Sequence, residues 1–143
     1  NFRKSEIYWI PKENNFRWLY FKVFKFIEEV KDLDYKLDGY CCQNCQYTEY
    51  DHSYKGFFNW HKDNDGETDN NEILRRTISV SIQISDPSDY EGGELLIMDD
   101  DGCIEKVFKI KGTITVFPSD ILHKVEPVTK GNRKSLVLWF LNV

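Results

Sequence analysis

The sequence predicts a mainly β fold, a sandwich or barrel of short strands with one or two helices near the N-terminus. Three observations support this fold class. Apolar residues recur at helical spacing between residues 15 and 30. Residues 77–84 alternate polar and apolar side chains without error, which is the period of a half-buried strand. From about Leu37 onward, short apolar runs alternate with turn-forming residues, as in proteins built from many strands.

The helix is predicted from a stripe of apolar side chains along one face. At helical spacing the stripe contains Phe16, Leu19, Tyr20, Val23, Ile27 and Val30. Asn14 or Asn15 is expected to cap the N-terminus, because a short polar side chain there can accept a hydrogen bond from the first turn. We expect the stripe, its aromatic rings included, to pack against one sheet.

The strands after residue 84 are separated by turn signals. They are expected at residues 93–98, 103–110, 113–117, 121–127 and 132–142. The segment between the strands expected at 93–98 and 103–110 ends in Asp-Gly, which favours a tight hairpin at residues 99–102. A turn at residues 129–131 is expected to join the last two.

The register of the last two strands follows if they form a hairpin centred near Val128. His123 then faces Arg133 across the ladder, and Ile121 faces Ser135. This register predicts that a guanidinium and a hydroxyl lie close to an imidazole inside the barrel.

The charge balance argues against two classes of partner. Lys and Arg total 19, Asp and Glu total 24, and the net charge is -5 with no basic stripe. We therefore expect no nucleic-acid partner and no anionic membrane partner. No apolar run approaches the ~18 residues of a membrane span. The 143 residues predict a single domain, residues 1–143, and the missing initiator Met predicts a chain trimmed at its N-terminus.

The four cysteines are predicted to be reduced and mostly buried. They are Cys41, Cys42, Cys45 and Cys103. Cys42 and Cys45 form a CxxC pair, but a zinc site of this kind needs a second pair, which the sequence lacks. Reduced cysteines favour a cytoplasmic location over an oxidising compartment.

Two of the three histidines are predicted to point into the barrel. His61 and Asp63 are two residues apart, so on a strand they share one face. His123 shares its face with apolar neighbours. Two imidazoles and one carboxylate form the facial triad of non-haem Fe(II) oxygenases, which leaves positions on the metal open. The third histidine, His52, lies in a polar stretch and is predicted to be on the surface.

An anion site is predicted on the last strand. By alternation, Arg133, Ser135, Val137 and Trp139 share the inward face. An inward guanidinium needs an anion, because an unpaired buried charge is costly. Its planar fork matches a carboxylate through two hydrogen bonds. The sequence therefore predicts a carboxylate ligand beside the metal site.

Taken together, these residues resemble the Fe(II)/2-oxoglutarate-dependent dioxygenase superfamily. Within it, the sequence is most similar to the prolyl 4-hydroxylase-like group and its PKHD-type hydroxylases. The resemblance runs from roughly Ile7 to Phe140. Its motifs are Tyr50 with residues 56–63, then residues 76–80, 85–95, 117–119 and 123–133.

The resemblance implies a double-stranded β-helix, a cupin-like jelly roll, with iron at one mouth. It implies that His61, Asp63 and His123 bind Fe(II). Mn(II), Co(II) and Ni(II) compete for such a ligand set, so the metal stays open. The cosubstrates implied are 2-oxoglutarate and O2, and the resemblance also points to ascorbate.

For 2-oxoglutarate, the resemblance implies that Arg133 holds the distal carboxylate. Ser135 and Tyr50 are expected to assist, and Tyr54 competes with Tyr50 for the tyrosine role. Prolyl 4-hydroxylases usually have Lys at the position of Arg133, and this departure leaves the substrate open.

The resemblance implies hydroxylation of a C–H bond with release of succinate and CO2. The leading substrate is a prolyl residue of a peptide or protein, and the alternative is a small molecule or free amino acid. A second hypothesis is a β-barrel module that binds a metal without turnover. A cupin-type enzyme would instead want a His-x-His pair, and a calcium loop at residues 61–72 would need an oxygen ligand where His61 stands.

Overall fold

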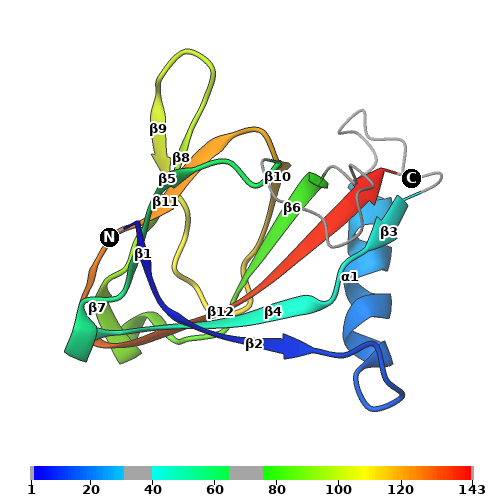
Figure 1. Ribbon diagram of the computed structural model, residues 1–143, viewed down its shortest axis with the longest axis horizontal. Helices are drawn as coiled ribbons and strands as arrows, with labels where there is room; N and C mark the ends of the chain where they lie inside the picture. Colours follow the sequence, from blue (N-terminus) through cyan, green and yellow to red (C-terminus); the bar gives the residue numbers. More distant parts are fainter. Residues whose placement is uncertain (1, 31–39, 65–75, 143) are drawn as a thin grey trace.

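The computed structural model describes residues 2–30, 40–64 and 76–142. These residues form two antiparallel sheets and one α-helix, which confirms the mainly β class (Figure 1). The smaller sheet has five strands. In spatial order they are β1 (Arg3–Lys4), β5 (Phe57–His61), β11 (Leu122–Val125), β8 (Leu95–Met98) and β9 (Ile104–Lys106).

The larger sheet is built around the long strand β12 (Val128–Asn142). In spatial order its main path is β10 (Ile114–Pro118), β6 (Arg76–Gln83), β12, β4 (Cys45–Asp51) and β2 (Glu6–Ile10). Two short strands also pair with β12, namely β3 (Tyr40–Cys42) and β7 (Tyr90–Gly92). The 3-10 helices η1 (His52–Tyr54) and η2 (Pro87–Asp89) follow β4 and precede β7. No helix among the described residues is long and apolar enough to cross a membrane.

Strand β6 separates the core from the barrel interior. Its alternating pattern sends Ile78 and Val80 toward the helix α1 (Arg17–Glu29), where they pack with Leu138 and Phe140 of β12. Ser79 and its alternate neighbours face the other way, into the barrel. Figure 1 shows α1 beside β3 and the C-terminal end of β12, far from β8 and β9. The predicted strand at residues 77–84 is therefore confirmed, and it has one face for stability and one for the site.

The helix begins at Arg17, two residues later than predicted. Phe16 is its N-cap and makes no side-chain cap, so the predicted capping by Asn14 or Asn15 is wrong. A backbone carbonyl satisfies a first-turn donor instead, since Leu19 N–H donates to the Phe16 carbonyl over 3.0 Å.

The apolar stripe of the helix packs only in part. Leu19, Val23 and Ile27 are buried against the larger sheet, whereas the Phe16 ring, at 38% exposed, does not join the core. The expectation that all aromatic rings of the stripe pack inward is therefore wrong for Phe16.

The hairpin at residues 99–102 is confirmed, but its second strand is short. Strands β8 and β9 pair antiparallel, and the Asp99 carboxylate accepts hydrogen bonds from the N–H groups of Asp101 and Cys103. Gly102 has φ +82°, which a glycine adopts without strain. Of the strand predicted at residues 103–110, only the part that forms β9, Ile104–Lys106, is a strand.

The predicted hairpin between the last two strands is wrong. Strand β11 pairs with β5 and β8 in the smaller sheet, and β12 lies in the larger one, so the chain changes sheets at residues 126–127. Arg133 pairs with Tyr50 rather than with His123. The predicted turn at residues 129–131 is therefore also wrong, and Gly131 lies inside β12 opposite Tyr90. A Cβ there would lie 1.9 Å from the Asp89 carbonyl oxygen, so this glycine permits a close backbone approach.

Candidate metal and carboxylate-binding site

Strands β5 and β11 bring the two predicted imidazoles together. His61 and His123 are Cα partners across the ladder, and their ring centroids are 4.1 Å apart. Asp63 follows β5, where its backbone N–H donates to the Ser119 carbonyl over 2.8 Å. One ligand atom from each of His61, Asp63 and His123 lies within 4.8 Å of the others. The three residues that the sequence singled out therefore converge, although the first and the last are 62 positions apart in the chain.

Backbone carbonyls orient both imidazoles. The Nδ1 atom of His61 lies 2.7 Å from the Asn59 oxygen, and that of His123 lies 2.9 Å from the Ile121 oxygen. A carbonyl oxygen only accepts hydrogen bonds, so each Nδ1 carries a proton and donates it. The Nε2 atoms then face the Asp63 Oδ1 atom, at 3.5 Å for His61 and 3.4 Å for His123.

Two side chains from the larger sheet hold the other oxygen of Asp63. Its Oδ2 atom accepts hydrogen bonds from Ser79 Oγ at 2.7 Å and from Trp139 Nε1 at 3.0 Å. Ser79 Oγ lies in turn 2.9 Å from Ser119 Oγ. Oδ1 is thereby left free to point at the imidazoles. Sequence reasoning missed these roles for Ser79 and Ser119. The signal for Ser79 was only the inward phase of a strand, and Ser119 follows β10 and stood only within a motif of the resemblance.

The three ligand atoms suit a metal ion. Two imidazole nitrogens and a carboxylate oxygen each offer an electron pair toward the same space, which is unfavourable unless a cation or protons lie between them. Without a metal, burial alone would raise the pKa of Asp63. When the Nε2 atoms of His123 and His61 carry protons in place of a metal, their hydrogen bonds and that of Ser79 outweigh burial and hold that pKa well below its usual range. The donor set therefore fits Fe(II) and similar divalent ions.

Arg133 is a buried cation in the same cavity. It is 3% exposed, and its Cζ atom lies 5.6 Å from the centre of the Tyr50 ring. Among the described residues, no carboxylate lies within 4.0 Å of its guanidinium. Gly93 makes room for it, because a Cβ there would lie 3.2 Å from Arg133 Cδ. This geometry suits an incoming anion.

The metal cluster and Arg133 line one narrow pocket of about 40 Å³. Ser135 and Tyr50 line it too, and both are almost fully buried. Burial raises the pKa of Tyr50, although the positive charges of Arg133 and Arg3 act in the opposite direction. Tyr54 does not line this pocket, and its hydroxyl donates to the Glu49 carbonyl over 3.2 Å. Of the two competing tyrosines, the geometry therefore favours Tyr50.

Other predicted candidates lie away from this pocket. His52 is exposed, and its Nδ1 lies 3.1 Å from the Gly131 oxygen. Cys45 is buried, and burial raises the pKa of its thiol to about 12. Within the part of the chain that the structure describes, the His61 cluster is the one group that could hold a metal. Most of the calcium-loop candidate at residues 61–72 lies outside the described residues.

Curated relatives of the chain are hydroxylases. A PKHD-type hydroxylase of Synechococcus sp. (strain JA-2-3B'a(2-13)) is 39% identical over 80 residues, 55% of this chain and 35% of that protein. A PKHD-type hydroxylase of Paraburkholderia phytofirmans is 46% identical over 66 residues, 46% of this chain and 29% of that protein. The chain thus spans about a third of the length of the curated relatives that it matches.

Solved prolyl hydroxylases share the fold. A Pseudomonas putida prolyl-4-hydroxylase has a TM-score of 0.75 at 24% identity, covering 99% of this chain and 74% of that one. The viral collagen prolyl hydroxylase from Paramecium Bursaria Chlorella virus-1 also has a TM-score of 0.75, at 23% identity, covering 99% and 80%. At these identities the likeness shows the fold alone, and it confirms the predicted jelly roll.

A family model described as the 2OG-Fe(II) oxygenase superfamily matches residues 45–141. The match covers well over half of the chain and includes the convergent histidines, the aspartate and the buried arginine. The chain belongs to the 2OG-Fe(II) oxygenase superfamily.

Proposed function

We propose that this chain is the catalytic part of an Fe(II)- and 2-oxoglutarate-dependent dioxygenase that hydroxylates a prolyl residue of a peptide or protein. One observation carries the proposal. Two imidazole nitrogens and a carboxylate oxygen converge in the same pocket as a buried arginine that has no carboxylate partner among the described residues.

In this proposal, the Nε2 atoms of His61 and His123 and the Oδ1 atom of Asp63 hold the metal. Bound Fe(II), with O2 and 2-oxoglutarate, supplies the oxidation in which C–H becomes C–OH while 2-oxoglutarate becomes succinate and CO2. The protein's part is ligand geometry. The carbonyls of Asn59 and Ile121 fix both rings, and Ser79 and Trp139 fix the carboxylate.

Arg133 would bind the distal carboxylate of 2-oxoglutarate through paired hydrogen bonds. Ser135 and Tyr50 offer hydroxyl groups on the same wall, and burial strengthens these contacts because water does not compete.

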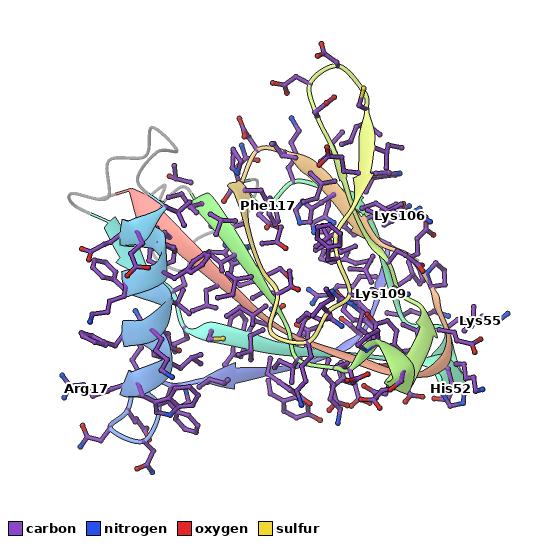
Figure 2. The ribbon with its side chains drawn as sticks, turned by 180° about the vertical axis from the view of Figure 1, so that it is seen from behind. Arg17, His52, Lys55, Lys106, Lys109 and Phe117 are labelled. Atoms are coloured by element: carbon purple, nitrogen blue, oxygen red, sulfur yellow. The ribbon has the colours of Figure 1, made fainter. Side chains whose placement is uncertain are left out.

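Aromatic rings surround the metal ligands and would exclude water from the reaction. Phe58 stacks on His61 with ring centroids 3.4 Å apart, and Phe117 meets the His123 ring at 4.8 Å. Phe117 belongs to β10, and Figure 2 shows it away from Arg17 and from His52. Excluding water favours oxidation of the bound substrate over side reactions.

The substrate class is supported by the relatives. The curated relatives are PKHD-type hydroxylases, and a prolyl hydroxylase from Trichoplax adhaerens with the same fold was solved in complex with a hypoxia inducible factor peptide. Arg133, where prolyl 4-hydroxylases usually have Lys, keeps a small molecule or free amino acid as the alternative substrate.

The test measures succinate release and peptide oxidation together. The chain is supplied with Fe(II), ascorbate, 2-oxoglutarate and a library of proline-containing peptides, and mass spectrometry detects the gain of one oxygen atom. D63A should lose both signals, and R133Q should raise the KM for 2-oxoglutarate by more than about tenfold. H52A is the matched control, because His52 lies on the surface and does not line the pocket (Figure 2).

Two outcomes would contradict the proposal. Metal binding without any 2-oxoglutarate turnover would identify a binding module instead. Oxidation of free amino acids in preference to every peptide would identify a small-molecule hydroxylase.

A further inference from the structure

A wide groove crosses the mouth of the candidate metal site. Its volume is about 680 Å³, and His61 and Asp63 form part of its floor. Its walls come from both sheets and include Phe2, Arg3, Trp9, Trp60, Arg76 and Trp139. A groove of this size and aromatic content exceeds what one free amino acid fills, and it suits an extended peptide.

Arg3 of β1 lies one aromatic ring away from a metal ligand. Its Cζ atom is 4.4 Å from the centre of the Phe58 ring. The same ring is stacked on His61 with an interplanar angle of 17°. A guanidinium on an aromatic face is held in position without losing its charge.

Arg76 of β6 likewise lies over an aromatic ring that contacts a predicted metal ligand, in this case Asp63. Its Cζ atom lies 3.7 Å from the centre of the Trp139 ring, and Trp139 donates its indole N–H to Asp63. Burial lowers the pKa of Arg76; the negative charge of Asp63 raises it, and the positive charge of Arg3 lowers it. Both guanidiniums line the same groove.

Neither arginine has an anionic partner among the residues that the structure describes. Arg3 donates to Ser5 Oγ at 2.7 Å and to Gln46 Oε1 at 3.1 Å. Arg76 donates from Nε to Gln43 Oε1 at 2.8 Å. All three acceptors are neutral, and each guanidinium has five N–H donors. Terminal N–H groups thus remain for a ligand.

The groove contains positively charged side chains although the chain as a whole is acidic. Acidic residues outnumber basic ones, 24 to 19, yet two arginines without an anionic partner among the described residues line the mouth of the site. In the proposed function, Arg133 is matched by the distal carboxylate of 2-oxoglutarate. Within the described part of the chain, Arg3 and Arg76 are then still unmatched, and an acidic group of the substrate can match them.

We infer that Arg3 and Arg76 bind an acidic side chain of the peptide substrate, close to the residue that is hydroxylated. The inference rests on the proposed function and specifies its substrate class as acidic peptides. Charge complementarity carries it, because a carboxylate in the groove gains hydrogen bonds to a positioned guanidinium on either side.

The test compares matched peptides on the intact chain. Fluorescein-labelled peptides contain one proline flanked by Glu at varied positions, and their controls have Gln in place of each Glu. Binding is measured by fluorescence anisotropy without O2, with Fe(II) and 2-oxoglutarate present. We expect the best Glu peptide to bind about tenfold more tightly than its Gln counterpart, with the gap closing at high salt.

Variants of both arginines give the sharper result. R3Q and R76Q should each reduce the preference for Glu while leaving the affinity for Gln peptides unchanged, and R3K and R76K should keep most of it. R17Q is the matched control, because Arg17 lies on α1 and outside the groove (Figure 2). Affinity for Fe(II) should stay the same in all five variants. Affinity for 2-oxoglutarate should stay the same in R76Q, R76K and R17Q, whereas Arg3 also lines the pocket that contains Tyr50.

Three results would overturn the inference. Equal loss of Glu and Gln peptides in R3Q or R76Q would mean that the arginines only support Phe58 and Trp139. Weaker 2-oxoglutarate binding in R76Q would assign Arg76 to the cosubstrate. Hydroxylation of peptides without regard to charge would leave the proposed function intact but remove the acidic substrate class. Conversely, a Glu preference without turnover would support the acid-binding groove and contradict the proposed hydroxylation.

Discussion

At the scale of single residues, the site depends on side chains that never touch the reacting atoms. Asp63 presents one oxygen to the imidazoles because Ser79 and Trp139 occupy the other. Partners of this kind typically contribute ten- to hundredfold to metal affinity, about as much as many direct interactions. The orientation of Asp63 is thus a property of the larger sheet.

We predict that S79A weakens Fe(II) binding by about tenfold, because one of the two donors to Asp63 Oδ2 is lost. Competition with a chelator measures the metal Kd, and S88A, in the exposed η2, is the control. A lower melting temperature with an unchanged metal Kd would mean that Ser79 has only a packing role.

Sequence reasoning identified His61, Asp63 and His123 because their types and spacing are specific to one chemistry. It also placed Arg133 and Ser135 on the inward face of their strand, because the alternation of side chains along a strand is enough to fix which face they share. It did not find Ser79. A serine in an alternating strand carries no chemical signal, and its partner lies 16 positions away on another sheet.

At the scale of elements, the route of β12 decides what surrounds Arg133. The strand begins four residues before the predicted start, pairs with β7 and then passes between β6 and β4. The hairpin prediction assumed that strands adjacent in sequence are adjacent in space. In this jelly roll the chain instead changes sheets, which local turn signals do not report.

We predict that G131A destabilises the fold far more than G112A. Both glycines have positive φ, +71° for Gly131 and +85° for Gly112, but only Gly131 faces a close backbone atom. G112A should lose about 1 kcal/mol from strain alone, and G131A several times more. Urea unfolding measures both, and equal losses would show that the approach to Asp89 is not rigid.

The carboxylate of Asp51 joins η1 to the strand pair β4 and β12. Hydrogen bonds from Ser53 and from Asn132 lower the pKa of Asp51 to about 2. Since this value lies below that of an unfolded Asp, about 3.9, the stabilisation is complete above that pH and is lost as the pH falls toward the folded value.

We therefore predict that D51N lowers the free energy of unfolding by about 1 kcal/mol at neutral pH. The difference from the parent chain should shrink as the pH falls below about 4. Denaturant titrations at a series of pH values measure it. A gap that stays constant down to pH of about 2 would contradict the assigned hydrogen bonds.

At the scale of the whole molecule, the site connects the two sheets. His61 and His123 belong to the smaller sheet, whereas the side chains that hold Asp63 belong to the larger one. A metal bound to all three ligands would therefore fasten one sheet to the other. The single-domain organisation stays a prediction, since the chain spans only part of its relatives.

We predict that a divalent metal at a hundredfold excess over its Kd stabilises the chain by about 2.7 kcal/mol, raising Tm by roughly 10 °C. Calorimetry with and without a chelator measures the shift. It should disappear in H123A and persist in H52A. An equal shift in both variants would place the metal elsewhere in the chain.

The alternation of β6 also bears on how the chain can diverge. Ile78 and Val80 serve the core, while Ser79 between them serves the aspartate. Neighbouring positions are therefore expected to tolerate different substitutions. Exchanges among aliphatic residues should be tolerated at the two outer positions, whereas the middle one should accept only a small hydroxyl. A homologue that retains the apolar pair but lacks the serine is expected to keep the fold while its aspartate is held less firmly for metal binding.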